Sequence, residues 1–129
     1  MAKDNSKKEM DFEIAFLEGV LKRKPDFHEA LNVLGDLYAR RGFYQKSLDI
    51  DKRLVNAKPD DPVVYYNLAC SYSLLNDIEN AIKSLRHAVL LGYNNFRFLQ
   101  IDEDLENLRA DKRFKEFVAK IVHKKTEKP

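Results

Sequence analysis

Hydrophobic residues recur along most of the chain at intervals of three, four and seven positions, which is the spacing of one face of an α-helix. Leu31, Leu34 and Tyr38 show this spacing, and so do Leu48 and Val55 further on. The pattern predicts helices at about 9–23, 28–41, 44–57, 62–75 and 78–91, and no stretch alternates as a β-strand would. The fold class indicated is all-α.

Residues suited to helix starts precede several of these segments. Asp61-Pro62 supplies a capping carboxylate and a ring that fits the first helical turn, and Asp26 followed by Glu29 resembles a capping box. After residue 95, Asp102 and Asp111 are expected to open two further short helices, because a helix N-terminus favours negative charge. The extreme ends, 1–8 and 125–129, are expected to be flexible tails.

The chain repeats itself at an offset of 34 residues, which predicts a solenoid of helix pairs. Gly42 and Asn76-Asp77 mark the turn inside each unit. The equivalent positions include Ile14, Leu48 and Ile82; Leu21, Val55 and Val89; Leu34 and Leu68; Gly35 and Ala69; Tyr38 and Tyr72. The organisation expected for the single domain 1–129 is a partial unit at 9–25, full units at 28–61 and 62–95, and capping helices at 96–124.

These positions resemble the tetratricopeptide repeat, whose signature combines an aromatic residue, Leu-Gly, Tyr, Ala and a closing Pro over 34 residues. The first unit carries Leu31, Leu34-Gly35, Tyr38, Ser47, Asp51 and Pro59 at the signature places, and the second carries Tyr65, Leu68-Ala69, Tyr72, Ala81, Leu85 and Tyr93. The segment 99–114 resembles the ending of small bacterial proteins of this family. The resemblance implies an α-α superhelix of antiparallel helix pairs with capping helices at both ends.

Asp51 departs from the family pattern, because it falls on the apolar stripe of its helix. A buried carboxylate is costly unless it is paired. We therefore expect Asp51 at a helix edge, bonded to a tyrosine hydroxyl or an arginine of the next helix, and we expect replacement by leucine to be neutral or stabilising. The second unit ends in Gly92-Tyr93, where a left-handed glycine would stop the helix and redirect the chain.

The resemblance implies that the first helices of the pairs line a concave face that contacts a partner protein. The side chains expected to turn away from the apolar stripe, and so to form this groove, are Glu29, Asn32, Asp36, Arg40, Val63, Tyr66, Asn67, Cys70 and Ser73. Amide, carboxylate, guanidinium and aromatic groups suit an extended peptide or a partner helix. Solvated faces of short helices are the simpler interpretation. Some family members clamp a C-terminal carboxylate, but Asp36 and Asn32 stand where an asparagine and a lysine would be expected.

Composition narrows the classes of function. Four scattered glycines exclude a Gly-rich phosphate loop, and the longest uncharged run, 62–76, is too short to span a membrane. No segment has the form of a secretory signal, and the single cysteine, Cys70, agrees with a reducing compartment, so a cytoplasmic location is expected. The segment 11–118 holds 16 basic and 18 acidic residues, which disfavours a nucleic-acid reader; the basic surplus lies in the ends.

The sequence offers little for catalysis, and neither a cofactor nor a metal is expected. His28, His87 and His123 lie on separate helices and lack zinc-binding spacing. Cys70 has no histidine near it in sequence and is expected to be a packing or groove residue. The acidic run 102–106 lacks the glycine and the distant glutamate of a calcium loop, and it is expected to be a charged helix start.

Three functions follow, in order. The first is a non-catalytic adaptor that binds a protein in the groove. The second is a structural protein that associates with itself as a homodimer, with Met10, Ile14 and Leu17 docking on a second copy. The third is an RNA-binding helical repeat, which the acidic core disfavours.

Overall fold

The computed structural model describes the backbone of residues 2–127 and the side chains of residues 6–121. Within that part of the chain there are eight α-helices, one short 3-10 helix and no strand, so the all-α prediction is confirmed. The elements are α1 (Ala2–Arg23), α2 (His28–Arg40), α3 (Tyr44–Ala57), α4 (Pro62–Leu74), α5 (Ile78–Leu90), α6 (Phe96–Leu99), η1 (Glu103–Leu105), α7 (Glu106–Arg109) and α8 (Lys112–Glu127).

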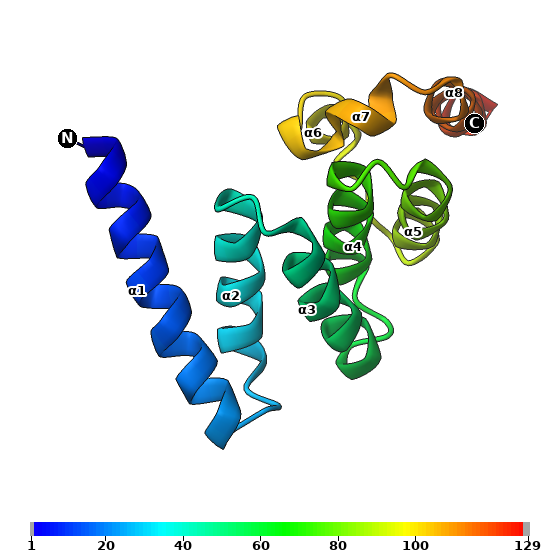
Figure 1. Ribbon diagram of the computed structural model, residues 1–129. Coiled ribbons are helices and arrows are strands. Elements are labelled where there is room, and N and C mark those ends of the chain that lie inside the picture. Colours follow the sequence, from blue (N-terminus) through cyan, green and yellow to red (C-terminus); the bar gives the residue numbers. More distant parts are fainter. Residues whose placement is uncertain (1, 128–129) are drawn as a thin grey trace.

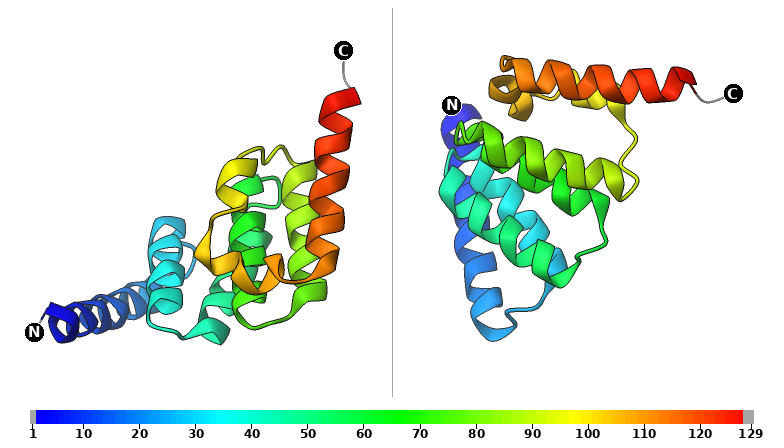
Figure 2. Two further views of the ribbon diagram at one scale, coloured as in Figure 1. Left: turned by 90° about the horizontal axis from the view of Figure 1, so that it is seen from above. Right: turned by 90° about the vertical axis from the view of Figure 1, so that its right-hand side faces the viewer.

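The first five helices stand side by side and alternate in direction, and the row curves from α1 to α5 (Figure 1). Helices α2/α3 and α4/α5 form two successive antiparallel pairs, offset by 34 residues in sequence, and α1 packs on α2. Beyond α5 the repeat stops. The short elements α6, η1 and α7 pack across one face of α4, from Tyr66 to Ser73, and α8 runs beside α5 (Figure 2).

Helix boundaries inside the repeats agree with the sequence prediction to within one residue, but both ends of the chain differ from it. Residues 2–8, expected as a tail, form the first turns of α1. At the other end α8 continues to Glu127, through part of the tail expected at 125–129. Residues 1 and 128–129 lie outside the described residues, so the prediction for them stays a prediction.

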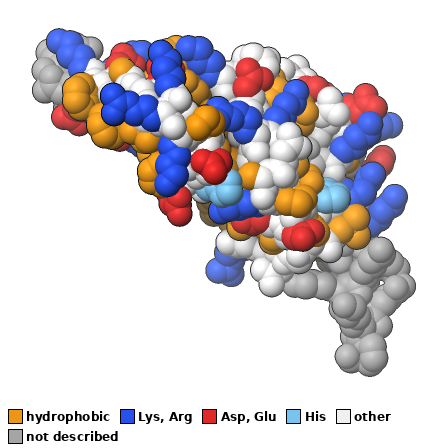
Figure 3. Space-filling view, turned by 90° about the horizontal axis from the view of Figure 1, so that it is seen from below, with side chains coloured by type: hydrophobic (Ala, Val, Ile, Leu, Met, Phe, Trp, Pro, Cys, Tyr) orange, Lys and Arg blue, Asp and Glu red, His pale blue; other side chains and the backbone are white. Residues whose placement is uncertain are grey.

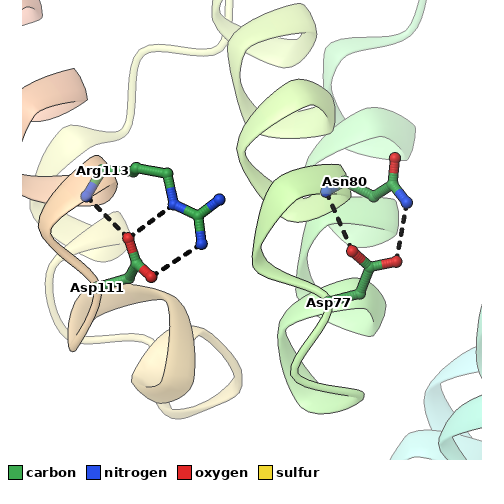
Figure 4. Close-up of polar contacts among 4 residues, drawn as sticks. All are labelled: Asp77, Asn80, Asp111 and Arg113. Carbon is green, nitrogen blue, oxygen red and sulfur yellow. Dashed lines mark hydrogen bonds and ion pairs between the residues drawn. The ribbon is translucent and has the colours of Figure 1, made fainter.

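Carboxylates cap the helices largely where the sequence placed them. Asp61 Oδ1 accepts a hydrogen bond from Val63 N at 2.9 Å, which satisfies one of the free N–H groups of the first turn of α4. Figure 4 shows two more caps. Asp77 accepts from Asn80 at the start of α5, and Asp111 accepts from Arg113 N at 2.9 Å while its carboxylate pairs with the Arg113 guanidinium. The pairing with Arg113 lowers the pKa of Asp111 to about 2.

The expected capping box at Asp26 is wrong. Helix α2 begins one residue later than that box requires, with Phe27 as its N-cap and no side-chain bond to the first turn. Instead, Phe27 N donates to Lys24 O at 3.2 Å, and the tight connection from α1 holds the chain there. A backbone turn therefore replaces the carboxylate.

The turns inside the units use the left-handed backbone that their residues favour. Gly42 has φ of +81° and Asn76 has φ of 61°, at equivalent positions of the two repeats. Gly92 has φ of 112°, which ends the second unit and turns the chain toward α6, as expected. Gly35 has a different role: a Cβ there would lie 3.2 Å from Ile50 Cγ2, so the small residue permits the close contact of α2 with α3.

Two groups of buried side chains form the core. One joins α1, α2 and α3, and it includes Ile14, Leu21, Leu31, Leu34, Tyr38, Ile50 and Leu54. The other joins α4 and α5 to the C-terminal helices, and it includes Tyr66, Ala69, Leu85, Leu99, Leu105, Leu108, Phe114 and Phe117. The C-terminal helices therefore cover apolar surface that the last repeat would otherwise expose to water.

Candidate functional site

The candidate site is a hollow of about 90 Å³ between α2, α3, α4 and η1. Four of the expected groove residues line it, namely Asn32, Asp36, Asn67 and Cys70. The other lining residues are Gly35, Ala39, Ser47, Asp51, Leu54, Ser71, Leu74 and Asp104. Three carboxyl groups and two amides therefore surround the hollow, and none of its lining residues is Lys, Arg or His.

The floor of the hollow is a buried hydrogen-bonded group centred on Asp51. The Ser71 hydroxyl on α4 donates to Asp51 Oδ2. Ser47, one turn before Asp51 on α3, donates to the Gly35 carbonyl at 3.0 Å, and its Oγ lies 3.2 Å from Ser71 Oγ. The group therefore links α2, α3 and α4.

Asp51 therefore differs from expectation. It is buried rather than placed at a helix edge, and its partner is a serine rather than a tyrosine or an arginine. Burial raises the pKa of Asp51 to about 6, and the hydrogen bond from Ser71 offsets part of that rise.

Tyr66 is not an exposed groove aromatic, and this expectation is wrong. Its ring stacks on Tyr93 with centroids 4.5 Å apart, and its hydroxyl donates to Asp102 Oδ2 at 2.5 Å. Only 5% of the residue is exposed. The C-terminal segment 93–102 folds back over α4 and covers Tyr66, which a helical projection of the repeat alone does not include. Burial, more than the nearby charges, raises the pKa of the Tyr66 phenol.

Ser73 and Cys70 are also buried, by the C-terminal residues from Asp102 to Leu108. Ser73 Oγ accepts from Leu108 N at 3.2 Å, and Asn107 Nδ2 donates to the Ser73 carbonyl at 3.0 Å, so Ser73 anchors the C-terminal helices instead of facing the groove. Cys70 does line the hollow, but little of it is exposed, and its Sγ lies 3.8 Å from Asp102 Oδ2 as a weak donor. Burial and the carboxylates of Asp102 and Asp104 raise the pKa of the Cys70 thiol, which disfavours a reactive thiolate.

The remaining expected groove residues are exposed. Asn32, Asp36 and Asn67 face one another across the hollow from α2 and α4. Glu29, Arg40 and Val63 lie outside its lining, and Arg40 pairs with Asp36 at 3.8 Å along the same helix. Whether any of these residues contacts a partner stays a prediction.

Asp104 is the lining residue that the repeat could not reveal, because it comes from η1, beyond the last unit. Burial, and then repulsion by Asp102, Asp36 and Glu103, raises the pKa of Asp104. These carboxylates are therefore close enough to Asp104 to disfavour its charged form, and the mouth of the hollow is acidic.

One group of side chains has the composition of a metal site. Cys70 Sγ and carboxylate oxygens of Asp102 and Asp104 lie within 4.8 Å of one another. Asp102, however, already accepts from Tyr66 and from Asp104 N, and the latter bond opens η1, so the acidic run is a charged helix start as expected. The raised thiol pKa also opposes metal binding, which requires the thiolate. Hydrogen bonding within the fold accounts for the group.

Comparison with known proteins agrees with the repeat pattern. A family model for the tetratricopeptide repeat matches residues 62–91. A chloroplastic protein from Arabidopsis thaliana is 32% identical over 96 residues, which cover 72% of this chain and 27% of that protein. The chain therefore spans about a quarter of the length of this curated relative.

A solved structure, "MamA 41-end from Desulfovibrio magneticus RS-1", superposes on this chain with a TM-score of 0.66. The superposition covers 95% of this chain and 70% of the other at 20% identity, and at that identity it supports the fold alone. Among the described residues, no helix is both long enough and apolar enough to cross a membrane. Family match, relative and fold agree with the 34-residue units of the sequence, and the chain belongs to the tetratricopeptide repeat family.

Proposed function

We propose that the chain is a non-catalytic adaptor that binds a partner protein in the hollow between α2, α3, α4 and η1. The observation that carries this proposal is the convergence of polar groups from separate elements: Asn32, Asp51, Asn67 and Asp104 come from four different elements and line one concavity. Stacked helix pairs offer such a curved face to partners, and its polar groups would fix the orientation of a bound segment.

The chemistry of the lining favours a partner that donates hydrogen bonds or carries positive charge. Asp36 and Asp104 present carboxylates at the mouth, and the amides of Asn32 and Asn67 can donate to or accept from an extended backbone. A Lys or Arg side chain of a partner segment would relieve the repulsion between these carboxylates. The same lining disfavours a C-terminal carboxylate or a nucleic-acid phosphate, as the sequence prediction also held.

The relatives support this proposal only at the level of fold and family. The name of the plant relative places that relative in the chloroplast, and this chain's location in the cytoplasm stays a prediction.

The direct test is a charge reversal at the hollow, Asp36→Lys. Proteins that co-purify with the wild-type chain from its native lysate are identified, and the binding of each purified candidate is then measured by calorimetry. Asp36→Lys is expected to weaken binding of a groove partner at least tenfold, because it places a cation where the partner's cation would lie.

Glu79→Lys is the matched control. Glu79 is exposed on α5 outside the hollow and, like Asp36, pairs with a basic residue four positions later, at 3.7 Å. The substitution makes the same charge change, so we expect binding within twofold of the wild type. A partner that binds Asp36→Lys as tightly as the wild type would overturn the groove assignment.

A further inference from the structure

Helix α1 has a second apolar stripe, which faces away from the rest of the molecule. Its members are Phe12, Ala15, Phe16 and Gly19, spaced at three, four and seven residues on one helical face. Phe12 is 74% exposed and Phe16 is 63% exposed. Hydrophobic side chains are visible along the α1 end of the molecule in Figure 3.

The opposite face of α1 is occupied. Ile14 and Leu21 are buried in the core that α1 shares with α2, and Met10 and Leu17 pack against it. The surface expected from the sequence to dock on a second copy, Met10, Ile14 and Leu17, is therefore not free. The exposed stripe lies on the other side of the helix.

In the two complete helix pairs, the positions equivalent to this stripe are buried. At the offset of 34 residues, Phe16 corresponds to Ile50 of α3 and Ser84 of α5, which are 6% and 7% exposed. Ile50 packs on Gly35 of the first helix of its unit. Phe16 thus stands where a first helix with a small residue at the crossing would pack, and no helix among the described residues occupies that place.

Helix α1 itself carries small residues on the stripe. Gly19 lies in the interior of a 22-residue helix, and a Cβ built there would meet nothing within 4 Å. Glycine at an exposed interior position costs a helix about 1 kcal/mol relative to alanine. The fold of the chain does not require that cost, whereas a close helix contact at Gly19 would explain it.

We propose that a second copy of the chain docks on this stripe, so that two α1 helices pair antiparallel with Phe16 of each over Gly19 of the other. In this register Phe16 lies against Gly19 of the partner, and Phe12 lies against the turn that follows Gly19, near Arg23. A parallel pair would set aromatic against aromatic and leave small residues facing each other across a gap.

Charge supports the same direction, although more weakly. Glu9 lies one turn before Phe12 and Arg23 lies one turn after Gly19, so antiparallel copies bring opposite charges together and each Phe12 near a guanidinium of the partner. Lys8, beside Glu9, reduces this gain. The packing of the large Phe16 side chain against the small Gly19 is therefore the main argument for the antiparallel direction.

The surface area buried between the two copies limits the affinity of the dimer. Four phenylalanines at this exposure would remove about 500 Å² of aromatic surface from water, below the roughly 1,200 Å² at which stable interfaces begin. The dimer is therefore expected to dissociate in the micromolar range, and it must be sought over a wide range of concentration.

The test is sedimentation velocity of the full chain from low micromolar to several hundred micromolar. The apparent mass of the wild type is expected to rise from 15.1 kDa toward twice that value. The double variant Phe12→Ser/Phe16→Ser is expected to raise the dissociation constant at least tenfold. Both side chains are exposed, so circular dichroism of the variant should match that of the wild type.

Gly19→Leu separates docking from folding. Leucine has open space there within the chain and is a better helix former than glycine, so the monomer should be as stable as the wild type or more so. The added side chain occupies the place of the partner's Phe16, so the dissociation constant should again rise at least tenfold.

Leu90→Ser, at a 78% exposed leucine on α5, is the control and should leave the dimer unchanged. A wild-type chain that stays monomeric at several hundred micromolar overturns the proposal. This holds even if another protein is found to bind the stripe. A Gly19→Leu variant that dimerises like the wild type also overturns it.

Discussion

The buried carboxyl of Asp51 couples folding to pH. Its pKa is about 6 in the folded chain, above the ordinary value of 3.8, because the charged form is poorly solvated. Well below pH 3.8 the carboxyl is protonated in both the folded and the unfolded chain, so its ionisation does not lower the stability. As pH rises through 6 the folded chain must hold a charge that the unfolded chain solvates freely, so stability falls. A shift of about two pKa units corresponds to about 3 kcal/mol as an upper figure.

Asp51→Leu should therefore stabilise the chain at pH 7.5, by about 1–3 kcal/mol, and the gain should shrink toward zero at pH 4. Leucine is the residue that the second unit carries at the equivalent position, Leu85, which is fully buried. Urea unfolding at the two pH values measures the difference. A variant that is less stable than the wild type at pH 7.5 would show that the Ser47–Ser71–Asp51 group stabilises the fold.

Asp49→Leu is the matched control, because Asp49 lies on the exposed face of the same helix. This substitution removes the same charge from an exposed position. We expect it to change the free energy of unfolding by no more than about 0.5 kcal/mol, as for other surface substitutions. The 34-residue register identified Asp51 as anomalous from the sequence. It could not name the partner, because Ser71 lies at a different position of the next unit and is brought to Asp51 by the packing of α4 on α3.

At the scale of the element, the helix boundaries inside the repeats were predictable from the sequence, whereas the start of α1 and the cap of α2 were not. Apolar spacing and the turn residues Gly42 and Asn76 indicated the helix boundaries inside the units, because each signal is local. The start of α1 was not predictable in this way, because between Ala2 and Met10 its first turns carry no apolar residue to show a helical period. The cap of α2 was missed because a turn with the same local sequence can be closed by the backbone instead of the Asp26 carboxylate.

The two capping sites give a direct comparison. Asp61→Ala removes the acceptor of Val63 N and should destabilise the chain by about 1 kcal/mol. Asp26→Ala removes the same group from a position that makes no capping bond to α2, so its effect should stay within about 0.5 kcal/mol. Thermal or urea unfolding of both variants measures the difference. Equal losses would mean that Asp26 caps the helix in solution.

At the scale of the whole molecule, the C-terminal segment determines which face of the repeat is available. It buries Tyr66 and Ser73, which a wheel projection of α4 alone places outward, and it contributes Asp104 to the hollow. The sequence indicated capping helices there but not their direction, because the 34-residue offset predicts contacts only between equivalent positions of the repeated units. Tyr66 and Ser73 were misplaced for this single reason.

The bond from Tyr66 to Asp102 is the link between the repeat and this segment. Tyr66→Phe keeps the stack on Tyr93 and removes the donor to a partly buried carboxylate, which should cost about 1–3 kcal/mol. Because Asp102 also opens η1 and Arg109 donates to its carbonyl at 2.6 Å, the loss should loosen residues 96–109 before the repeat. Hydrogen exchange should then rise in that segment and stay unchanged in α2.

Tyr65→Phe, one residue earlier on α4, is the control for this experiment, because the Tyr65 ring packs on His87 with centroids 4.1 Å apart while Asp102 accepts from Tyr66. Exchange in 96–109 should match the wild type in that variant. If Tyr66→Phe also left the segment protected, the apolar contacts of Leu99, Leu105 and Leu108 alone would hold it in place. The acidic mouth formed by Asp104 would then not depend on the tyrosine bond, and the hollow would persist in the variant.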